Sequence, residues 1–375
     1  MNTLSMKRAL LILTWTFLLA ASSPVTDTRA WGETDAERYF NQALQDCETG
    51  SYETALDAAK KALELEPDSP RAFNYLGIIH KRLGHLEEAT SYFKKAMEAD
   101  PGFAPAYSNL GTIYLDSGTI DEAIEMHKKA VELVPKGAGF HNNLALALEK
   151  KGMTEDAAMV AMHATALAPQ LAEPHWNLGR LCLKKKMYFK AISELEKATQ
   201  IAPDLTPARH LLVRAYISQN VLKKAEDECM KLLESNPQDA LAHANLGVIY
   251  GRKGLTKEAV QEIQKALDMH PGLAVAHIAL GDLYVKEKRF NEALSEYEEA
   301  IKSDPDLADA HLGIANLYNS AGMLDEALSD FKEAARLDPH NPDAHKGLAY
   351  TYELKGMVEE ADKEYDIYEA YMKLR

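Results

Sequence analysis

Apolar residues recur at spacings of three and four along most of this chain, the pattern of a helix that buries one face. From residue 36 onward the pattern repeats every 34 residues, and each period contains two apolar runs separated by a short turn. The first run covers about positions 1 to 14 of the period (helix A), and the second covers about positions 17 to 30 (helix B). This pattern predicts an all-α chain of helical hairpins.

Alanine and proline define the 34-residue frame. Alanine occupies position 20 of every period, where a small residue lets two antiparallel helices pack closely. Five further prolines fall in the first turn of a helix A, where a missing amide hydrogen is tolerated. The prolines at position 32 are Pro67, Pro101, Pro135, Pro169, Pro203, Pro237, Pro271, Pro305 and Pro339.

Glycine is the usual residue at position 15, between the two helices, where it fits the left-handed conformation that ends a helix. Lys186, Asn220 and Lys288 replace it in three periods, so those turns are expected to be strained or differently shaped. The glycines at this position are Gly50, Gly84, Gly118, Gly152, Gly254, Gly322 and Gly356.

One period shows the family resemblance in full. The chain is identified as a member of the tetratricopeptide repeat (TPR) family, whose 34-residue consensus contains a spaced aromatic, Leu-Gly, aromatic, Ala and Pro. The residues that match it are Tyr107, Leu110, Gly111, Tyr114, Ala123, Ala130 and Pro135. The resemblance implies an α-solenoid, a right-handed superhelix of ten helix-turn-helix repeats. Its A helices are expected to line a concave groove.

The frame divides the repeat region into ten units that end at residue 375. The units are 36–69, 70–103, 104–137, 138–171, 172–205, 206–239, 240–273, 274–307, 308–341 and 342–375. Residues 31–35 are expected to be a short linker, with oxygen atoms of Thr34 and Asp35 available to cap the first helix.

Residues 1–30 show the features of a secretory signal peptide followed by a linker. Lys7 and Arg8 precede an apolar run from Ala9 to Ala21, which is shorter than the ~20 residues that span a bilayer, and small residues follow it. We therefore expect a cleaved signal and a periplasmic or secreted protein. An uncleaved N-terminal membrane anchor is the alternative.

Charge and cysteine content exclude several classes of function. The net charge of -15 and the pI near 5.4 disfavour nucleic acid, which binds through Lys and Arg, although an acidic surface suits a basic partner. Cys47, Cys182 and Cys229 form no CxxC pair, so neither a disulfide framework nor a zinc site is expected. Catalytic sequence motifs are also absent, and we predict a non-enzymatic protein without cofactors.

Histidine occupies position 4 in six units, at a site that is aromatic in the first three units. Successive A helices lie about 10 Å apart or more, too far to share a zinc ion whose ligands each lie ~2.1 Å from it. The histidines are therefore interpreted as packing residues. They are His141, His175, His243, His277, His311 and His345.

Position 6 of helix A contains the most interesting polar residues, Asn109, Asn143, Asn177 and Asn245. They resemble the asparagine ladder in the TPR region of O-linked N-acetylglucosamine transferases, where such amides grip the backbone of an extended peptide. The repeats continue to Arg375, so the resemblance is not expected to extend to transferase activity. The alternative is that these amides are solvated polar residues.

Neighbouring positions complete the candidate groove and exclude a second kind of TPR site. No unit combines Lys at position 5 with Asn at position 9, so the carboxylate clamp of the family is absent. A basic middle followed by an acidic stretch is expected to orient a bound chain. The further groove candidates are Asn74, Asn142, Trp176, Arg180, Arg214 and Asp282.

The last helix departs from the repeat, because Tyr368 takes a position where Ala is usual. Its tyrosines are expected either to cover the end of the core or to form a docking patch for a partner or a second copy.

Together these features predict a scaffold or adaptor that binds extended segments of other proteins in its groove, outside the cytoplasm. The alternative is a periplasmic component of polysaccharide export or envelope assembly, whose acidic surface guides a cationic polymer.

Overall fold

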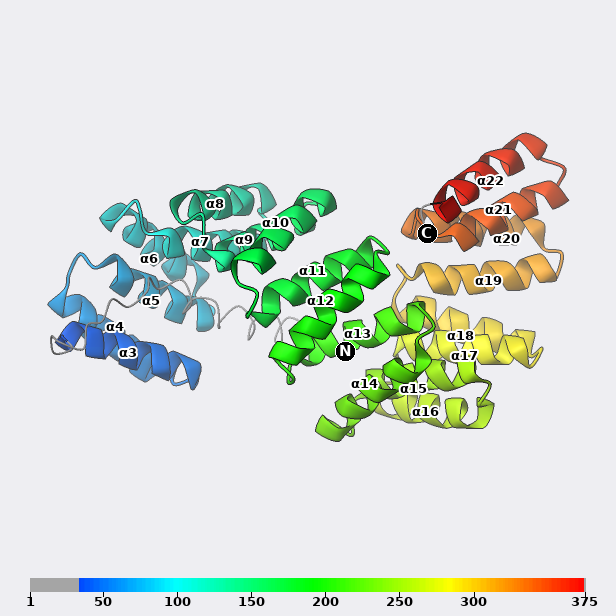
Figure 1. Cartoon of the computed structure of the whole chain (residues 1–375), viewed down its shortest axis with the longest axis horizontal. Helices are drawn as coiled ribbons and strands as arrows, with labels where there is room; N and C mark the ends of the chain where they lie inside the picture. The colour runs from blue at the N-terminus through cyan, green and yellow to red at the C-terminus, as the bar shows by residue number, and fades with distance from the viewer. Residues whose placement is uncertain (1–33, 374–375) are drawn as a thin grey trace. The chain divides into compact units, whose positions relative to one another are not determined.

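The computed structural model describes residues 34–373 as twenty helices, α3 to α22, and this part of the chain contains no strand (Figure 1). The all-α prediction is confirmed. The predicted signal peptide lies outside the described residues. The A helices are α3 (Asp35–Glu48), α5 (Pro70–Arg82), α7 (Ala104–Asp116), α9 (Ala138–Lys150), α11 (Ala172–Lys184), α13 (Thr206–Ser218), α15 (Ala240–Lys253), α17 (Ala274–Lys286), α19 (Ala308–Ser320) and α21 (Pro342–Leu354).

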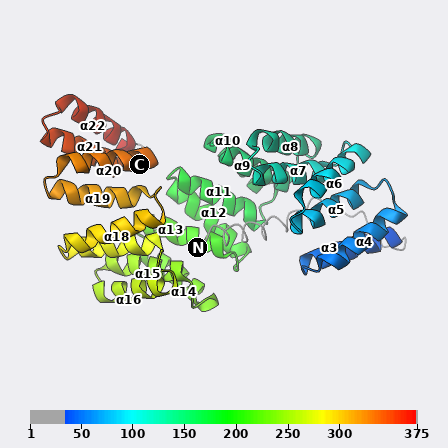
Figure 2. The ribbon, with the colours of Figure 1, turned by 180° about the vertical axis from the view of Figure 1, so that it is seen from behind.

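The B helices alternate with the A helices along the chain, as the view from behind also shows (Figure 2). They are α4 (Tyr52–Leu65), α6 (Leu86–Ala99), α8 (Ile120–Leu133), α10 (Thr154–Leu167), α12 (Tyr188–Ile201), α14 (Leu222–Ser235), α16 (Thr256–Met269), α18 (Phe290–Ser303), α20 (Leu324–Leu337) and α22 (Val358–Lys373).

The helices form two compact bodies, which we call the N-terminal body (residues 34–208) and the C-terminal body (residues 209–373). Within each body a B helix packs on the A helix before it and on the A helix after it. Successive A helices also pack on each other, as α9 does on α11 and α15 on α17, more closely than successive B helices do. The A helices therefore form the inner side of each body. The prediction of a solenoid of helical hairpins is confirmed, whereas the hand of its superhelix stays a prediction.

Local backbone chemistry sets where the helices begin and end. Thr34 caps α3 as predicted: its hydroxyl accepts from the Glu37 amide and the Glu37 carboxylate accepts from the Thr34 amide, both at 3.1 Å. The position-15 glycines have φ between 75° and 86°, the left-handed conformation that was predicted. Lys186, Asn220 and Lys288 adopt the same conformation, with φ of 57°, 55° and 63°. These three turns therefore have the usual shape and some backbone strain.

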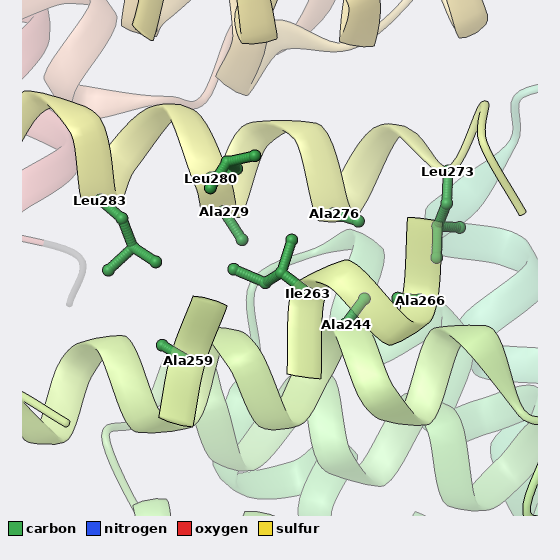
Figure 3. Packing of buried hydrophobic residues seen from close by; sticks show 9 residues of the cluster. All are labelled: Ala244, Ala259, Ile263, Ala266, Leu273, Ala276, Ala279, Leu280 and Leu283. Carbon is green, nitrogen blue, oxygen red and sulfur yellow. The ribbon is translucent and has the colours of Figure 1, made fainter. Parts of the chain in front are cut away.

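Close approach of the helices depends on alanine and on glycine–ring contacts. The position-20 alanines are completely buried in almost every hairpin. In the C-terminal body the ring of Tyr297 lies between Gly281 of α17 and Gly313 of α19, and its hydroxyl donates to Asp282 at 2.7 Å. Figure 3 shows a similar layer nearby, where Ile263 points from α16 toward α17. The side chains in that layer are Ala244, Ala259, Ile263, Ala266, Leu273, Ala276, Ala279, Leu280 and Leu283.

His127 is an exception in this core, because its ring is completely buried on α8 and neither ring nitrogen has a hydrogen-bond partner. Burial, with a smaller contribution from Lys81, lowers the pKa of His127 to about 3, so the ring is neutral. The ring packs against Gly111, as Leu195 packs against Gly179 in another hairpin.

Replacing His127 with leucine is expected to stabilise the N-terminal body by about 1 kcal/mol, because an unsatisfied buried polar group is removed. Urea unfolding of the full chain measures this gain. Lys128→Leu, at an exposed position of α8, is the control and should change little. A loss of stability in His127→Leu would show that the imidazole has a partner in solution, such as a water molecule.

Candidate binding surface on the A helices

Three of the position-6 asparagines, Asn109, Asn143 and Asn177, make side-chain hydrogen bonds to the preceding A helix in the N-terminal body. Asn109 Nδ2 donates to Asn74 Oδ1 at 2.8 Å, and Asn177 Nδ2 donates to Asn142 Oδ1 at 2.7 Å. Asn143 Nδ2 donates to Ser108 Oγ at 3.0 Å. Each bond joins residues 35 apart, so these six side chains form what we call the amide ladder, from α5 through α7 and α9 to α11.

Five of the six ladder side chains are buried, and Asn143 is partly buried. Asn177 is 2% exposed, Asn142 is 4% exposed and Asn109 is 8% exposed. Asn74 and Asn142 were among the sequence candidates, whereas Ser108 was not, and the bonds were not predicted. The signal was present in the sequence, since Asn109, Asn143 and Asn177 each have a polar residue 35 positions earlier.

Bonded amides in this ladder still have unused hydrogen-bonding capacity. A carboxamide has two donors and an acceptor oxygen, and each ladder bond uses only one donor of the later asparagine. The Oδ1 atom of Asn177 has no partner among the described residues, and neither has the indole Nε1 of the adjacent Trp176, a residue that is 7% exposed. An acceptor and a donor without protein partners therefore occur on consecutive residues of α11.

Arg180, in the basic middle of the predicted groove, is paired with a carboxylate in the structure. Arg180 of α11 makes two bonds to Glu149 of α9, Nη1 to Oε1 at 2.6 Å and Nη2 to Oε2 at 2.5 Å. This bidentate pair lies between the same two A helices as the bond from Asn177 to Asn142. The pair fixes the spacing of these helices and leaves less positive charge than the sequence indicated.

Three candidates, Arg214, Asn245 and Asp282, belong to the C-terminal body, whereas the amide ladder belongs to the N-terminal body. Asn245 is 8% exposed on α15. Burial raises the pKa of Asp282, whose carboxylate accepts a hydrogen bond from the hydroxyl of Tyr297. Asp282 is thus a structural partner of a buried ring in this body. The hydrogen bonds that join candidate asparagines lie within the N-terminal body.

The position-4 histidines have a role beyond packing. In five units the Nδ1 atom lies 2.5–2.8 Å from a carboxylate 19 residues later on helix B. In four of these the Nε2 atom also faces the carbonyl oxygen of the proline six residues earlier, at 2.8–3.2 Å. His175, for example, links α11 to Glu194 of α12 and to Pro169. The packing interpretation was therefore incomplete, and the His-to-carboxylate spacing of 19 was the missed signal.

These contacts predict a loss of stability in acid. Burial raises the pKa of Glu194 and of Glu262, but hydrogen bonds from His175 and Lys197 to Glu194, and from Lys265 and His243 to Glu262, lower both below 4.5. When the pH falls below the ordinary pKa of these two carboxyl groups, they bind protons in the unfolded chain but not yet in the folded chain. The stabilisation is therefore complete above pH 4.5 and is lost as the pH falls through the folded values.

Urea midpoints between pH 3 and pH 6 measure this effect, with the Glu194→Gln/Glu262→Gln double variant as comparison. We expect a shallower pH dependence in the double variant. An unchanged pH dependence would contradict the assignment to these two carboxylates.

The last helix, α22, shows features of both arrangements predicted for it, tyrosines that cover the end of the core and an exposed patch. The hydroxyl of Tyr365 on α22 donates to Glu353 of α21 at 3.2 Å, and the hydroxyl of Tyr371 lies 2.9 Å from His340 Nδ1. Ile367 and Met372 on the same helix are 36% and 44% exposed. Two tyrosines therefore pack back onto the array, and an apolar surface remains.

Residues 34–373 contain neither a cluster of metal ligands nor a helix that could cross a membrane. No group of three or more His, Cys, Asp or Glu residues in this range could hold a metal ion. Its helices are also all too short or too polar to span a bilayer.

Stacked helical hairpins with a bonded polar face on the inner helices define a helical-repeat protein of the solenoid class. Tetratricopeptide repeat models match most of the chain, and it belongs to that family. Models described as "Tetratricopeptide repeat" match residues 70–103, 92–125, 183–247, 240–272, 278–342 and 318–370, and one described as "TPR repeat" matches residues 43–84 and 111–152.

This chain is similar to several solved structures at low sequence identity. A tetratricopeptide repeat protein from Parabacteroides merdae is 17% identical, with a TM-score of 0.60, and the match covers 66% of this chain and 98% of that one. YrrB, described as a TPR protein with an unusual peptide-binding site, is 23% identical with a TM-score of 0.45, and the match covers 52% and 97%. Yeast Tom70 is 14% identical with a TM-score of 0.48, and the match covers 91% and 92%. No curated protein sequence matches significantly.

Proposed function

We propose that this chain is a non-enzymatic scaffold that binds an extended polypeptide segment along the A helices of its N-terminal body, outside the cytoplasm. The fold supports a role in protein–protein interaction. The proposal treats residues 36–375 as ten units with the boundaries given above. It assigns binding to the amide ladder together with Trp176 and Arg180.

The observation that carries this proposal is the unused acceptor of Asn177 beside the unused donor of Trp176. A peptide group presents one N–H and one C=O, so an extended backbone complements such a pair. The ladder bonds hold the amides of α7, α9 and α11 in fixed orientations. Pre-organised side chains lose less conformational freedom when a ligand binds, which raises affinity.

The ligand site is proposed to open when a segment binds, since the two unpaired atoms are buried in the free structure. We propose that the Trp176 indole moves when the segment binds, so that its Nε1 atom becomes available to the ligand. Binding is therefore expected to change the fluorescence of the chain. Trp176 is the only tryptophan among residues 34–373, so a full chain with Trp15→Phe and Trp31→Phe reports on this one indole.

Replacing Asn109, Asn143 and Asn177 together with alanine is expected to weaken peptide binding at least about tenfold, which is ~1.4 kcal/mol. It should also destabilise the N-terminal body by about 1 kcal/mol for each buried hydrogen bond. The ligands are peptides selected from a random library displayed against the full chain, and fluorescence anisotropy measures their affinity.

A matched control separates binding from stability. Ile124 is buried on α8, away from the ladder, and Ile124→Val should cost about 1 kcal/mol without affecting affinity. Selected peptides that bind the triple variant as tightly as the wild-type chain would remove the ladder from the site.

Export rests on the features of residues 1–30, and N-terminal sequencing of the mature protein tests it. A mature chain that begins at Met1 and fractionates with the cytoplasm would refute this part.

Association of two copies through the exposed residues of α22 is also proposed, and sedimentation of a Met372→Glu variant tests it.

A further inference from the structure

The outer side of α10 in the N-terminal body is apolar. From Ala157 to Leu167 this helix has no Asp, Glu, Lys or Arg. Met159 is 62% exposed and Met162 is 45% exposed on it. On the next B helix, α12, Phe189 is 81% exposed, the highest value among the large apolar side chains of residues 34–373. We call Met159, Met162, Phe189 and the adjacent Lys190 the outer patch.

The outer patch interrupts a polar pattern that the rest of the repeat keeps. Every residue a multiple of 34 away from Met159 is polar or charged, and so is every residue a multiple of 34 away from Phe189. The exposed side chains of the patch contribute little to the core. Contiguous exposed apolar surface usually marks an interaction site. The equivalents of Phe189 are Glu53, Glu87, Asp121, Glu155, Lys223, Lys257, Asn291, Asp325 and Glu359.

Lys190 gives the outer patch its charge. Its Nζ atom lies 3.0 Å from the Sδ atom of Met162, which is a weak acceptor, and this contact joins α12 to α10. The nearby Lys185 pairs with Glu155 at 3.1 Å, whereas Lys190 has no carboxylate partner within residues 34–373. Seven of the residues that occupy the position of Lys190 in the other units are Glu or Asp. The patch therefore combines exposed apolar side chains with one uncompensated cation, in a chain whose net charge is -15.

We propose that the outer patch docks an amphipathic helix of another protein. The apolar stripe of that helix lies on Met159, Met162 and Phe189, and one of its carboxylates pairs with Lys190. Methionine adapts its shape to a partner and is favoured on such helix-binding surfaces. The backbone groups of α10 and α12 are paired within their own helices, so a docked segment has to bind through side chains, as a helix does.

Charge complementarity favours this occupant over two others. A second copy related by a two-fold axis through the patch would place Lys190 against its own equivalent. An anionic bilayer would be repelled by the acidic remainder of the chain. The patch lies on B helices, on the opposite side of the hairpins from the amide ladder, so the chain can hold two partners at once.

A designed peptide tests the proposal. The probe is a helical peptide of about 18 residues, five turns long, with leucines at i, i+3, i+4 and i+7 and one central glutamate beside that stripe. Its twin has lysine in place of the glutamate. Fluorescence anisotropy with the full chain should show that the glutamate peptide binds at least about tenfold more tightly than its twin, since charge pairs select partners.

Charge reversal and apolar substitutions then locate the site. Lys190→Glu should reverse the preference, so that the lysine peptide binds more tightly. Met162→Glu should weaken the binding of both peptides at least about tenfold. Met230→Ser changes an exposed methionine of α14 and should leave both affinities unchanged. The triple asparagine variant should also bind both peptides normally, which separates this site from the amide ladder.

Three outcomes would overturn the proposal. One is an unchanged peptide preference in Lys190→Glu. Another is binding of the wild-type chain to phosphatidylglycerol vesicles that Met162→Glu abolishes, which would identify a membrane surface instead. The last is a dimer of the wild-type chain, measured by sedimentation equilibrium, that Met162→Glu dissociates.

Discussion

Replacing Gly281 with valine is expected to destabilise the C-terminal body by about 3 kcal/mol, the upper part of the usual range for overpacking. A Cβ atom at Gly281 would lie 2.6 Å from Cε1 of Tyr297. The ring has no room to retreat, because Gly313 lies against its other face and the hydroxyl is bonded to Asp282. Urea unfolding of the full chain, followed by circular dichroism, measures the effect.

A double variant tests the cause of that loss. Tyr297→Ala alone should cost about 3–5 kcal/mol, as removal of a buried ring does. If the Gly281→Val loss is steric, the double variant should lose clearly less than the sum of the two single losses. Additive losses would show that valine acts elsewhere. Glu298→Ala, at an exposed site of α18, is the control for substitution as such.

Replacing Arg209 with alanine is expected to cost the C-terminal body about 3 kcal/mol. Arg209 is 8% exposed and makes an ion pair with Glu228 on α14, whose side chain is 14% exposed. Removal of one member of a buried pair leaves the other charge uncompensated, which costs ~3–5 kcal/mol. Lys231 also contacts Glu228 and should keep the loss near the lower value. Chemical unfolding of the full chain measures it.

Arg209→His is the informative companion of this variant. Arg209 and Glu228 are 19 residues apart, the spacing at which His175 contacts Glu194 and His243 contacts Glu262. Histidine should therefore recover much of the stability lost in Arg209→Ala. A histidine variant as unstable as the alanine variant would mean that this site is not equivalent to those of the histidine units.

The repeat frame predicted the helices and their turns closely, because both depend on residues near each other in the chain. Gly50 marks a left-handed turn, Pro70 marks the first turn of a helix, and Ala123 marks a tight contact between helices. The left-handed conformation of Lys186, Asn220 and Lys288 could be expected from the frame alone, since the turn between the two helices demands it.

Partners between units were harder to predict. The bond from Asn177 to Asn142 depends on how one A helix is set against the previous one, and a repeat period does not encode that setting. For the same reason the sequence indicated that Arg180 is a free positive charge, whereas in the structure it pairs with Glu149. The outer patch was also missed, because its residues are unusual only when compared with equivalent residues of all the other units.

The reactivity of the three cysteines reports on local unfolding of the chain. Each thiol is free and buried, and burial raises the pKa of Cys47 to about 11 and that of Cys229 to about 12. Because only the thiolate reacts, alkylating reagents and oxidants should ignore the closed molecule. Labelling at Cys47 then times the local unfolding of one body and labelling at Cys229 times that of the other. The same inertness should keep the folded chain from forming mixed disulfides under oxidising conditions.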